Sequence, residues 1–152
     1  MSEGTTVWQK AHIKGFTNVK IEQAREQRNI YYQELLKNED IVINGVQDIL
    51  KELSKNFQMG IVTTSRRVDF DIIHKERGLV DYMDFVLCEE DYEFAKPHPQ
   101  PYLKGLELFG GTKEEAIVVE DSKRGLTAAH RAGIDCVIVH NEFTKTQDFS
   151  NA

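Results

Sequence analysis

The chain has 152 residues, of which 40% are hydrophobic and 29% charged, a balance typical of one globular domain with a real core. Its formal net charge of −6 argues against a nucleic-acid-binding protein, which normally carries the opposite sign. No apolar run approaches the roughly 20 residues of a membrane span. Residues 1–20 show no apolar signal segment either, so we expect a cytoplasmic protein that does not insert into membranes.

The first predicted element is a helix over residues 19–37, which contains few helix breakers and has apolar side chains at helical spacing, among them Ile21, Ala24 and Leu35. The pattern changes at Asn44–Gly45. We therefore predict a helix-rich part in residues 1–44 and a different part in residues 45–152.

Beyond residue 45, short apolar runs alternate with helical patterns. The runs cover residues 59–63, 85–88, 117–119 and 136–139, and the helices cover residues 46–53, 66–77, 100–109 and 123–132. Ser65 and Ser122 are the predicted N-caps of the second and fourth helices. Such alternation is typical of βαβ units, so we predict an α/β fold with a parallel sheet. Cys88 and Cys136 lie in two of the runs and are predicted to be buried free thiols.

Two segments carry side chains suited to phosphate. In G-I-V-T-T-S, Thr63 ends an apolar strand and its hydroxyl faces a helix start, a setting that suits an anion. In A-K-P-H-P, Lys96 stands between small and rigid residues and could direct an ammonium group at a phosphate. The structural alternatives are a plain strand end with its N-cap and a solvated loop lysine.

A third segment, A-I-V-V-E-D-S-K-R-G, places Glu120 and Asp121 side by side at the end of a strand. Adjacent carboxylates are costly unless a cation neutralises them, and Mg²⁺ takes one or two carboxylates together with phosphate oxygens and water. The alternative is that the two acids are the solvated end of the strand.

Taken together and in this order, the three segments resemble the haloacid dehalogenase-like hydrolase superfamily, most closely its phosphoglycolate phosphatase and β-phosphoglucomutase branch. The resemblance covers residues 19–149. It implies a Rossmann-like three-layer sandwich with a mostly parallel sheet. Residues 1–44 would be the remnant of a helical cap, and residues 45–152 an incomplete core.

The resemblance also implies roles for single residues. Thr63 would bind phosphate with its hydroxyl, helped by the backbone N–H of Thr64, and Lys96 would balance the charge of nucleophile and phosphate. Asp121 would bind Mg²⁺, with Glu120 beside it. The expected activity is that of a phosphatase or phosphomutase acting on a small phosphorylated metabolite.

One family motif has no counterpart. The family uses an aspartate in a D-x-D-x-[TV] motif on its first core strand, and residues 1–18 contain no aspartate. Asp69-Phe70-Asp71 has the D-x-D spelling, but in a predicted helix its two carboxylates would diverge. We therefore expect the isolated chain to be inactive, either as an incomplete product or as a pseudoenzyme that binds phosphate or Mg²⁺. An unrelated anion-binding α/β domain is a third interpretation.

The missing motif also leaves a place in the predicted sheet. The first core strand of the family lies between the strand ending at Thr63 and the strand ending at Val119. These two strands could pair directly, or a partner chain could supply a strand. We expect residues 5–13 to fill the place, because T-T-V-W favours a strand; Lys10 to His12 would then make the site cationic.

Overall fold

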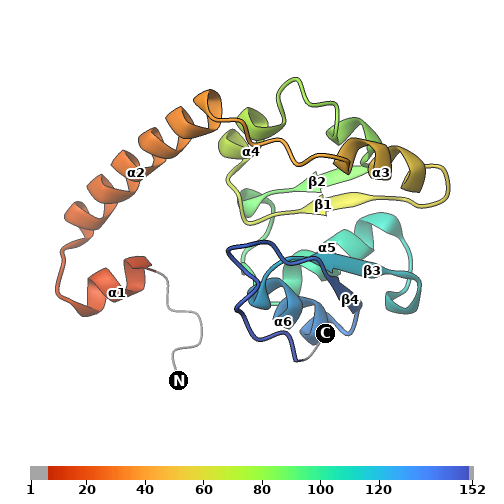
Figure 1. Ribbon diagram of the computed structural model, residues 1–152. Helices are drawn as coiled ribbons and strands as arrows, with labels where there is room; N and C mark the ends of the chain where they lie inside the picture. Colours follow the sequence, from red (N-terminus) through yellow and green to blue (C-terminus); the bar gives the residue numbers. More distant parts are fainter. Residues whose placement is uncertain (1–6, 151–152) are drawn as a thin grey trace. The chain divides into compact units, whose positions relative to one another are not determined.

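The computed structural model of the protein describes residues 7–150 and divides the chain into two compact units, Met1–Val42 and Ile43–Ala152 (Figure 1). The assignment of the first part as a cap remnant stays a prediction. None of the helices in the described part has the length and apolarity that crossing a membrane would take.

Two helices, α1 (Val7–Ile13) and α2 (Asn18–Asn38), make up the described part of the first unit. Thr17 caps α2, with its Oγ1 accepting a hydrogen bond from Lys20 N at 3.4 Å. The helices contact each other through Trp8, whose ring lies 5.4 Å from the guanidinium carbon of Arg25 and 5.9 Å from that of Arg28. Cation–π contacts of this kind hold the two helices together.

The expectation that residues 5–13 form a strand is wrong for Val7–Ile13, which are helical. Residues 5 and 6 lie outside the described residues. The local strand preference of Val7 and Trp8 is weak, and it is overridden because the Trp8 ring packs on α2. The expectation that Lys10 to His12 make the site cationic depended on this strand, and it is wrong for the same reason.

The second unit contains two separate pairs of parallel strands. Strand β1 (Gly60–Val62) pairs with β2 (Phe85–Leu87), and β3 (Ile117–Glu120) pairs with β4 (Asp135–Ile138). All four lie where the apolar runs predicted them. With the helices between them, they form the predicted Rossmann-like α/β fold.

The helices of this unit are α3 (Val46–Leu53), α4 (Arg67–His74), α5 (Gln100–Phe109) and α6 (Lys123–Ala132), with 3-10 turns η1 (Val80–Tyr82), η2 (Glu89–Asp91) and η3 (Lys113–Glu115). The bounds of α3, α5 and α6 match the sequence prediction. Ser122 caps α6 as predicted, since its Oγ accepts from Gly125 N at 3.1 Å.

Helix α4 differs from its prediction at both ends. It begins at Arg67, after Arg66 and not Ser65, because the Glu90 carboxylate accepts from Arg67 N and takes the place of a serine cap. It ends at His74, three residues before the predicted end. Lys75 leaves the helical conformation and Glu76 has a φ of 69°, which stops the helix before Gly78 is reached.

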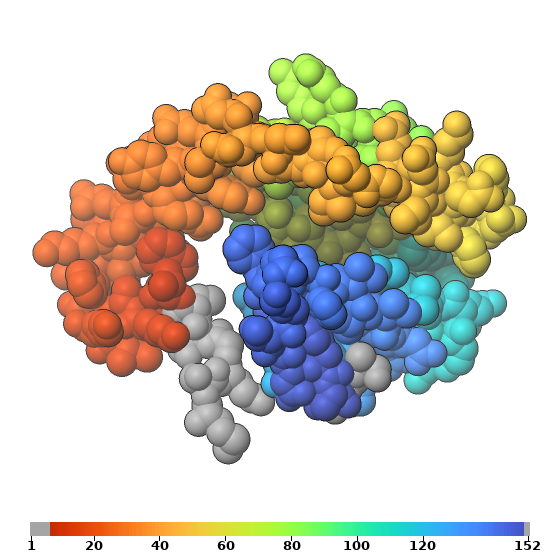
Figure 2. Space-filling model, viewed as in Figure 1, coloured from red at the N-terminus to blue at the C-terminus, as the bar shows by residue number. Residues whose placement is uncertain are grey.

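The core of the unit lies between α5, α6 and the strands. Tyr102, Ala128, Ala129 and Ile134 are buried there, and α6 contacts both β3 and β4. The segment after β4 lies on the surface of this unit (Figure 2), where Gln147 Oε1 accepts from Lys123 N at 2.7 Å.

The two cysteines are free, as predicted, but only Cys88 is fully buried and Cys136 is half-buried. Burial raises the pKa of both thiols. Cys136 is more exposed than predicted because β3 and β4 alternate between exposed and half-buried residues, so the strands are not covered along their whole length.

Candidate functional site

The carboxyl ends of β1 and β3 border one open cavity of about 540 Å³. Every residue predicted to take part in the site lines it: Thr63, Thr64, Lys96, Glu120 and Asp121. Ligands of parallel α/β sheets bind at the carboxyl ends of the strands, so this cavity is the expected place for a site.

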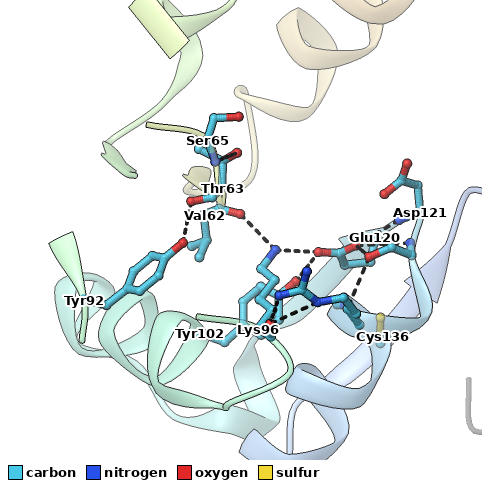
Figure 3. A network of polar contacts seen from close by, with 12 residues as sticks. Val62, Thr63, Ser65, Tyr92, Lys96, Tyr102, Glu120, Asp121 and Cys136 are labelled. Carbon is cyan, nitrogen blue, oxygen red and sulfur yellow. Dashed lines mark hydrogen bonds and ion pairs between the residues drawn. The ribbon is translucent and has the colours of Figure 1, made fainter. Parts of the chain in front are cut away.

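Lys96 lines the cavity, and its side chain lies between Val62 and Glu120 (Figure 3). Its side chain is only 9% exposed, and its Nζ donates to Val62 O at 3.0 Å and to Glu120 Oε1 at 2.5 Å. Nζ also lies 4.5 Å from the centre of the Tyr102 ring. An ammonium group has three donors, so these two bonds leave one N–H for a ligand.

Both carboxylate oxygens of Glu120 have partners. Oε1 accepts from Lys96 and from the Tyr102 hydroxyl at 2.6 Å, while Oε2 accepts from Ser122 Oγ at 3.0 Å and from the backbone N–H groups of Asp121 and Ser122. Burial acts to raise the pKa of Glu120, but the charge of Lys96 and these hydrogen bonds outweigh it and hold the pKa below its ordinary value. Glu120 is therefore an anion at neutral pH.

Two tyrosine hydroxyls donate hydrogen bonds to residues of the site. Burial, followed by the neighbouring Glu120 carboxylate, raises the pKa of Tyr102, so its hydroxyl stays protonated and donates to Glu120. The Tyr92 hydroxyl donates to Thr63 O at 2.6 Å, and burial raises the pKa of Tyr92 to about 12. Both tyrosines are thus fixed donors that hold strand ends in place.

Thr63 has a hydroxyl that is partly engaged. Its Oγ1 accepts from Ser65 N at 3.1 Å, which shapes the turn after β1. Because the oxygen accepts this bond, the hydroxyl proton remains available to a phosphate oxygen. Thr64 follows at the exposed rim of the cavity.

Asp121 differs from Glu120 in being exposed. Its Oδ2 accepts from Asn141 Nδ2 at 2.8 Å, and the residue is exposed and lines the cavity. Within residues 7–150, no three His, Cys, Asp or Glu side chains gather in a way that could hold a metal ion. Asp121 alone fits a Mg²⁺ ion that takes its remaining ligands from water and phosphate, whereas the oxygens of Glu120 are already occupied.

The D-x-D pair of α4 lies outside this cavity. Asp69 is buried and bound by Arg66 in a two-pronged ion pair at 2.7 and 2.8 Å, while Asp71 is exposed. Arg67, which follows the Thr63 turn, pairs with Asp91 at 2.7 Å. Both aspartates lie in α4, as predicted, but a solvated helix face is wrong for Asp69, because Arg66 binds it in a buried ion pair.

Four contributors to the site were missed by the sequence analysis: Tyr92, Tyr102, Arg124 and Asn141. Arg124 donates from its guanidinium to Lys96 O and so holds the lysine loop. It stands in the same segment as Glu120 and Asp121, a signal that could have found it. Tyr102 and Asn141 carry no such signal, because their partners are distant in the sequence.

Residues 4–139 match the family described as haloacid dehalogenase-like hydrolase. Among curated proteins, the chain is 32% identical over 109 residues to the pyrophosphatase PpaX of Bacillus cereus (strain AH820), covering 72% of this chain and 49% of that protein. A similar protein of Bacillus mycoides (strain KBAB4) is 31% identical over 115 residues. The chain spans about half the length of the curated relatives it matches.

Solved structures share the fold. A HAD hydrolase of family IA, variant 3, from Entamoeba histolytica HM-1:IMSS aligns with a TM-score of 0.79 at 24% identity, covering 93% of this chain and 67% of that one. CbbY from Rhodobacter sphaeroides in complex with phosphate aligns with a TM-score of 0.74 at 22% identity, covering 91% of this chain and 62% of that one. β-Phosphoglucomutase from Clostridium difficile aligns with a TM-score of 0.71 at 23% identity, covering 85% of this chain and 58% of that one.

Proposed function

The chain belongs to the haloacid dehalogenase-like hydrolase family, and on that premise we propose that its cavity binds the phosphoryl group of a small phosphorylated metabolite. The observation that carries the proposal is the buried Lys96 ammonium, held between Val62 O and Glu120 at the carboxyl ends of two parallel strands. Relatives in sequence are pyrophosphatases, and the fold relative CbbY was crystallised with phosphate.

Each residue has a definite part in this proposal. The Thr63 hydroxyl donates its proton to one phosphate oxygen, and the free N–H of Lys96 donates to another. The backbone N–H of Thr64 completes the donor set. Fixed donors of this kind stabilise the charge of a phosphoryl group without having to reorganise, which is their value in phosphoryl transfer.

Magnesium is the cofactor that fits the remaining acid. Asp121 would hold it, with Asn141 fixing the orientation of the carboxylate. Bound there, Mg²⁺ would neutralise charge on the phosphate oxygens. With one available carboxylate its affinity is weak, because a hard cation loses affinity as charged ligands are removed.

We further propose that this 152-residue chain binds phosphorylated ligands without hydrolysing them. The hydrolase chemistry of the family starts with an aspartate nucleophile, and residues 1–18 provide none. Loss of a nucleophile costs several orders of magnitude in rate even where binding groups remain.

A second function is a pseudoenzyme that uses the same cavity as a non-catalytic phosphate-binding module. The observation that favours it is that both carboxylate oxygens of Glu120 already have partners. Glu120 therefore neutralises the charge of Lys96 within a buried ion pair, and the lysine is not a free cation. Binding without turnover is common to this function and to an incomplete hydrolase. Supplying the absent part of the relatives' chain distinguishes the two, since only the hydrolase would gain turnover.

Titration calorimetry with inorganic phosphate tests the phosphate site. Thr63→Val keeps the shape of the side chain and removes the hydroxyl, so we expect roughly tenfold or greater loss of affinity, the effect of one hydrogen bond to a charged group. Thr63→Ser is the matched control and should bind as the native chain does. Equal binding by Thr63→Val and the native chain would remove the hydroxyl from the site.

Titration with Mg²⁺ tests the metal site separately. We expect weak binding that Asp121→Asn abolishes and that Glu120→Gln leaves largely intact, because Glu120 has no free oxygen. A panel of pyrophosphate, phosphoglycolate, a sugar phosphate and an aryl phosphate should show no turnover above a mock purification. Robust turnover that disappears in Asp121→Asn would disprove the inactivity of the chain.

A further inference from the structure

Arg124 is a cationic side chain on the wall of the cavity that the proposed phosphate site does not use. The other cation of the cavity wall, Lys96, is neutralised by Glu120 in a buried ion pair at 2.5 Å. Arg124 takes part in none of the ion pairs among residues 7–150, so no carboxylate of this part lies within ion-pair distance of its guanidinium. Its charge is therefore available to an anionic ligand.

One edge of the Arg124 guanidinium is already engaged. Nε donates to Lys96 O at 3.1 Å, and Nη2 donates to the same carbonyl oxygen. A guanidinium has five N–H groups, so with these two engaged, two remain on Nη1 and one on Nη2. One N–H of Nη1 and the remaining one of Nη2 are parallel, and together they match the two oxygens of a carboxylate or a phosphate.

The engaged edge also fixes the direction of the free one. Two bonds to Lys96 O restrict the rotation of a long side chain, so less conformational entropy is lost when an anion binds. The backbone N–H groups of Lys123 and Gly125, on either side of Arg124, already have partners. The guanidinium is therefore the strongest donor at this end of the cavity.

Arg124 and the phosphate donors lie at opposite ends of Lys96. The lysine ammonium binds Val62 O, next to Thr63 at the end of β1, whereas the lysine carbonyl binds Arg124 at the start of α6. The four-carbon stem of the lysine separates these two ends. The cavity of about 540 Å³ is of the size of small-molecule sites, roughly 300–1,000 Å³, and a single phosphate ion fills only part of it. A ligand with two separate polar groups fits this arrangement.

We propose that Arg124 binds a second anionic group of the ligand, a carboxylate or a second phosphate, while the phosphate site described above binds its phosphoryl group. Arg124 thereby selects metabolites that carry two anionic groups over metabolites of similar size that carry one. This role of Arg124 rests on the proposed function and adds to it the chemical class of the ligand.

Titration calorimetry of the native chain, with a metal chelator in the buffer, compares two pairs of ligands. Phosphoglycolate and ethyl phosphate are similar in size, but only phosphoglycolate carries a carboxylate. Pyrophosphate and inorganic phosphate test a second phosphate in the same way. We expect the doubly anionic member of at least one pair to bind about tenfold or more tightly, the effect of hydrogen bonds between charged groups. That pair identifies the second group.

Arginine variants of α6 test the residue itself. Arg124→Met keeps the stem and removes the donors, so we expect it to lose the preference for the doubly anionic ligand. Arg124→Lys keeps the charge without the paired donors and should retain only part of the preference. Arg131→Met is the matched control and should retain all of it, because Arg131 donates to the same loop, at Pro97 O and 3.1 Å, and does not line the cavity.

Two results would overturn this role and leave the phosphate site in place. The first is equal affinity of the native chain for both members of each pair, which needs no variant to fold. The second is a loss in Arg124→Met that is the same for singly and doubly anionic ligands, because Arg124 then acts only by holding the lysine loop. If the native chain binds none of the four ligands, the phosphate site and the role of Arg124 are both disproved.

Discussion

At the scale of single residues, Glu120 decides the character of the site. Its predicted place beside a metal ion stays a prediction; in the structure it contacts Lys96, Tyr102 and Ser122. A buried carboxylate without a cation is costly, and here the lysine ammonium provides the charge. The pair thus links the end of β3 to the loop that carries Lys96.

The first prediction concerns this ion pair. Lys96→Met should lower the free energy of unfolding by about 3–5 kcal/mol, because it leaves Glu120 buried without its cation. The double variant Lys96→Met with Glu120→Gln should recover much of the loss, since glutamine carries no charge, its amide oxygen can accept from Ser122, and its NH2 group can donate to the Tyr102 oxygen. Urea unfolding of Lys96→Met, Glu120→Gln and the double variant measures the free energy of unfolding of each. A double variant as unstable as the sum of the single ones would contradict it.

The second prediction is a pH dependence from the same carboxylate. Because the pKa of Glu120 is lower in the folded protein than its ordinary value of 4.5, the unfolded chain binds more protons near and below that pH. The stabilisation is present above pH 4.5 and is lost as the pH falls through the lower folded value. Glu120→Gln should reduce the slope of unfolding free energy against pH in this range. An unchanged slope would show that other carboxylates account for it.

At the scale of elements, α6 is tied to β3 by a close approach at its first turn. A Cβ atom on Gly125 would lie 1.9 Å from the Glu120 carboxyl carbon and 2.1 Å from its Oε1. The glycine is therefore required by the Glu120 network and not by its own backbone angles. Ser122 takes part in the same network, as N-cap of α6 and as donor to Glu120.

The third prediction follows from this contact. In an ordinary helix, Gly→Ala stabilises by about 0.5–1 kcal/mol. Gly125→Ala should instead destabilise the protein and displace Glu120 from Lys96, which thermal unfolding and loss of phosphate binding would report. Gly105→Ala in α5 is the matched control. Its Cβ would lie 3.3 Å from the Phe85 ring and from Val62, where a small shift suffices, so little change is expected.

At the scale of the whole molecule, the two compact units differ in their burial. Ile21 is the one buried residue in the described part of the first unit, whereas the second holds a buried cluster around Tyr102, Ala128 and Ile134. Local stability follows buried apolar contact. The first unit should therefore open far more readily than the second.

The fourth prediction states this as a measurement. In native-state hydrogen exchange, the amides of α2 should exchange well before those of α5 and α6, and moderate urea should change the α2 rates first. Trp8→Ala should speed the exchange of α2 further, because it removes the contacts with Arg25 and Arg28. Equal protection of α2 and α6 would show that the two units unfold together.

Local signals in the sequence were enough to predict the four strands and the bounds of α3, α5 and α6. Apolar periodicity, Ser122 as a cap and Gly133 past the helix end are local signals, so no distant contact was needed to interpret them. The same holds for the gathering of Thr63, Lys96 and Asp121, since parallel strands bring their carboxyl ends to one edge.

The contact partners of these residues follow from the three-dimensional arrangement and not from the sequence pattern. That Glu120 binds Lys96 and Tyr102, that Glu90 and not Ser65 satisfies the start of α4, and that Val7–Ile13 form a helix all depend on contacts between distant residues. Local propensities set which segments become strands, but pairing is settled by which edges meet in space, and a sequence pattern does not carry that information.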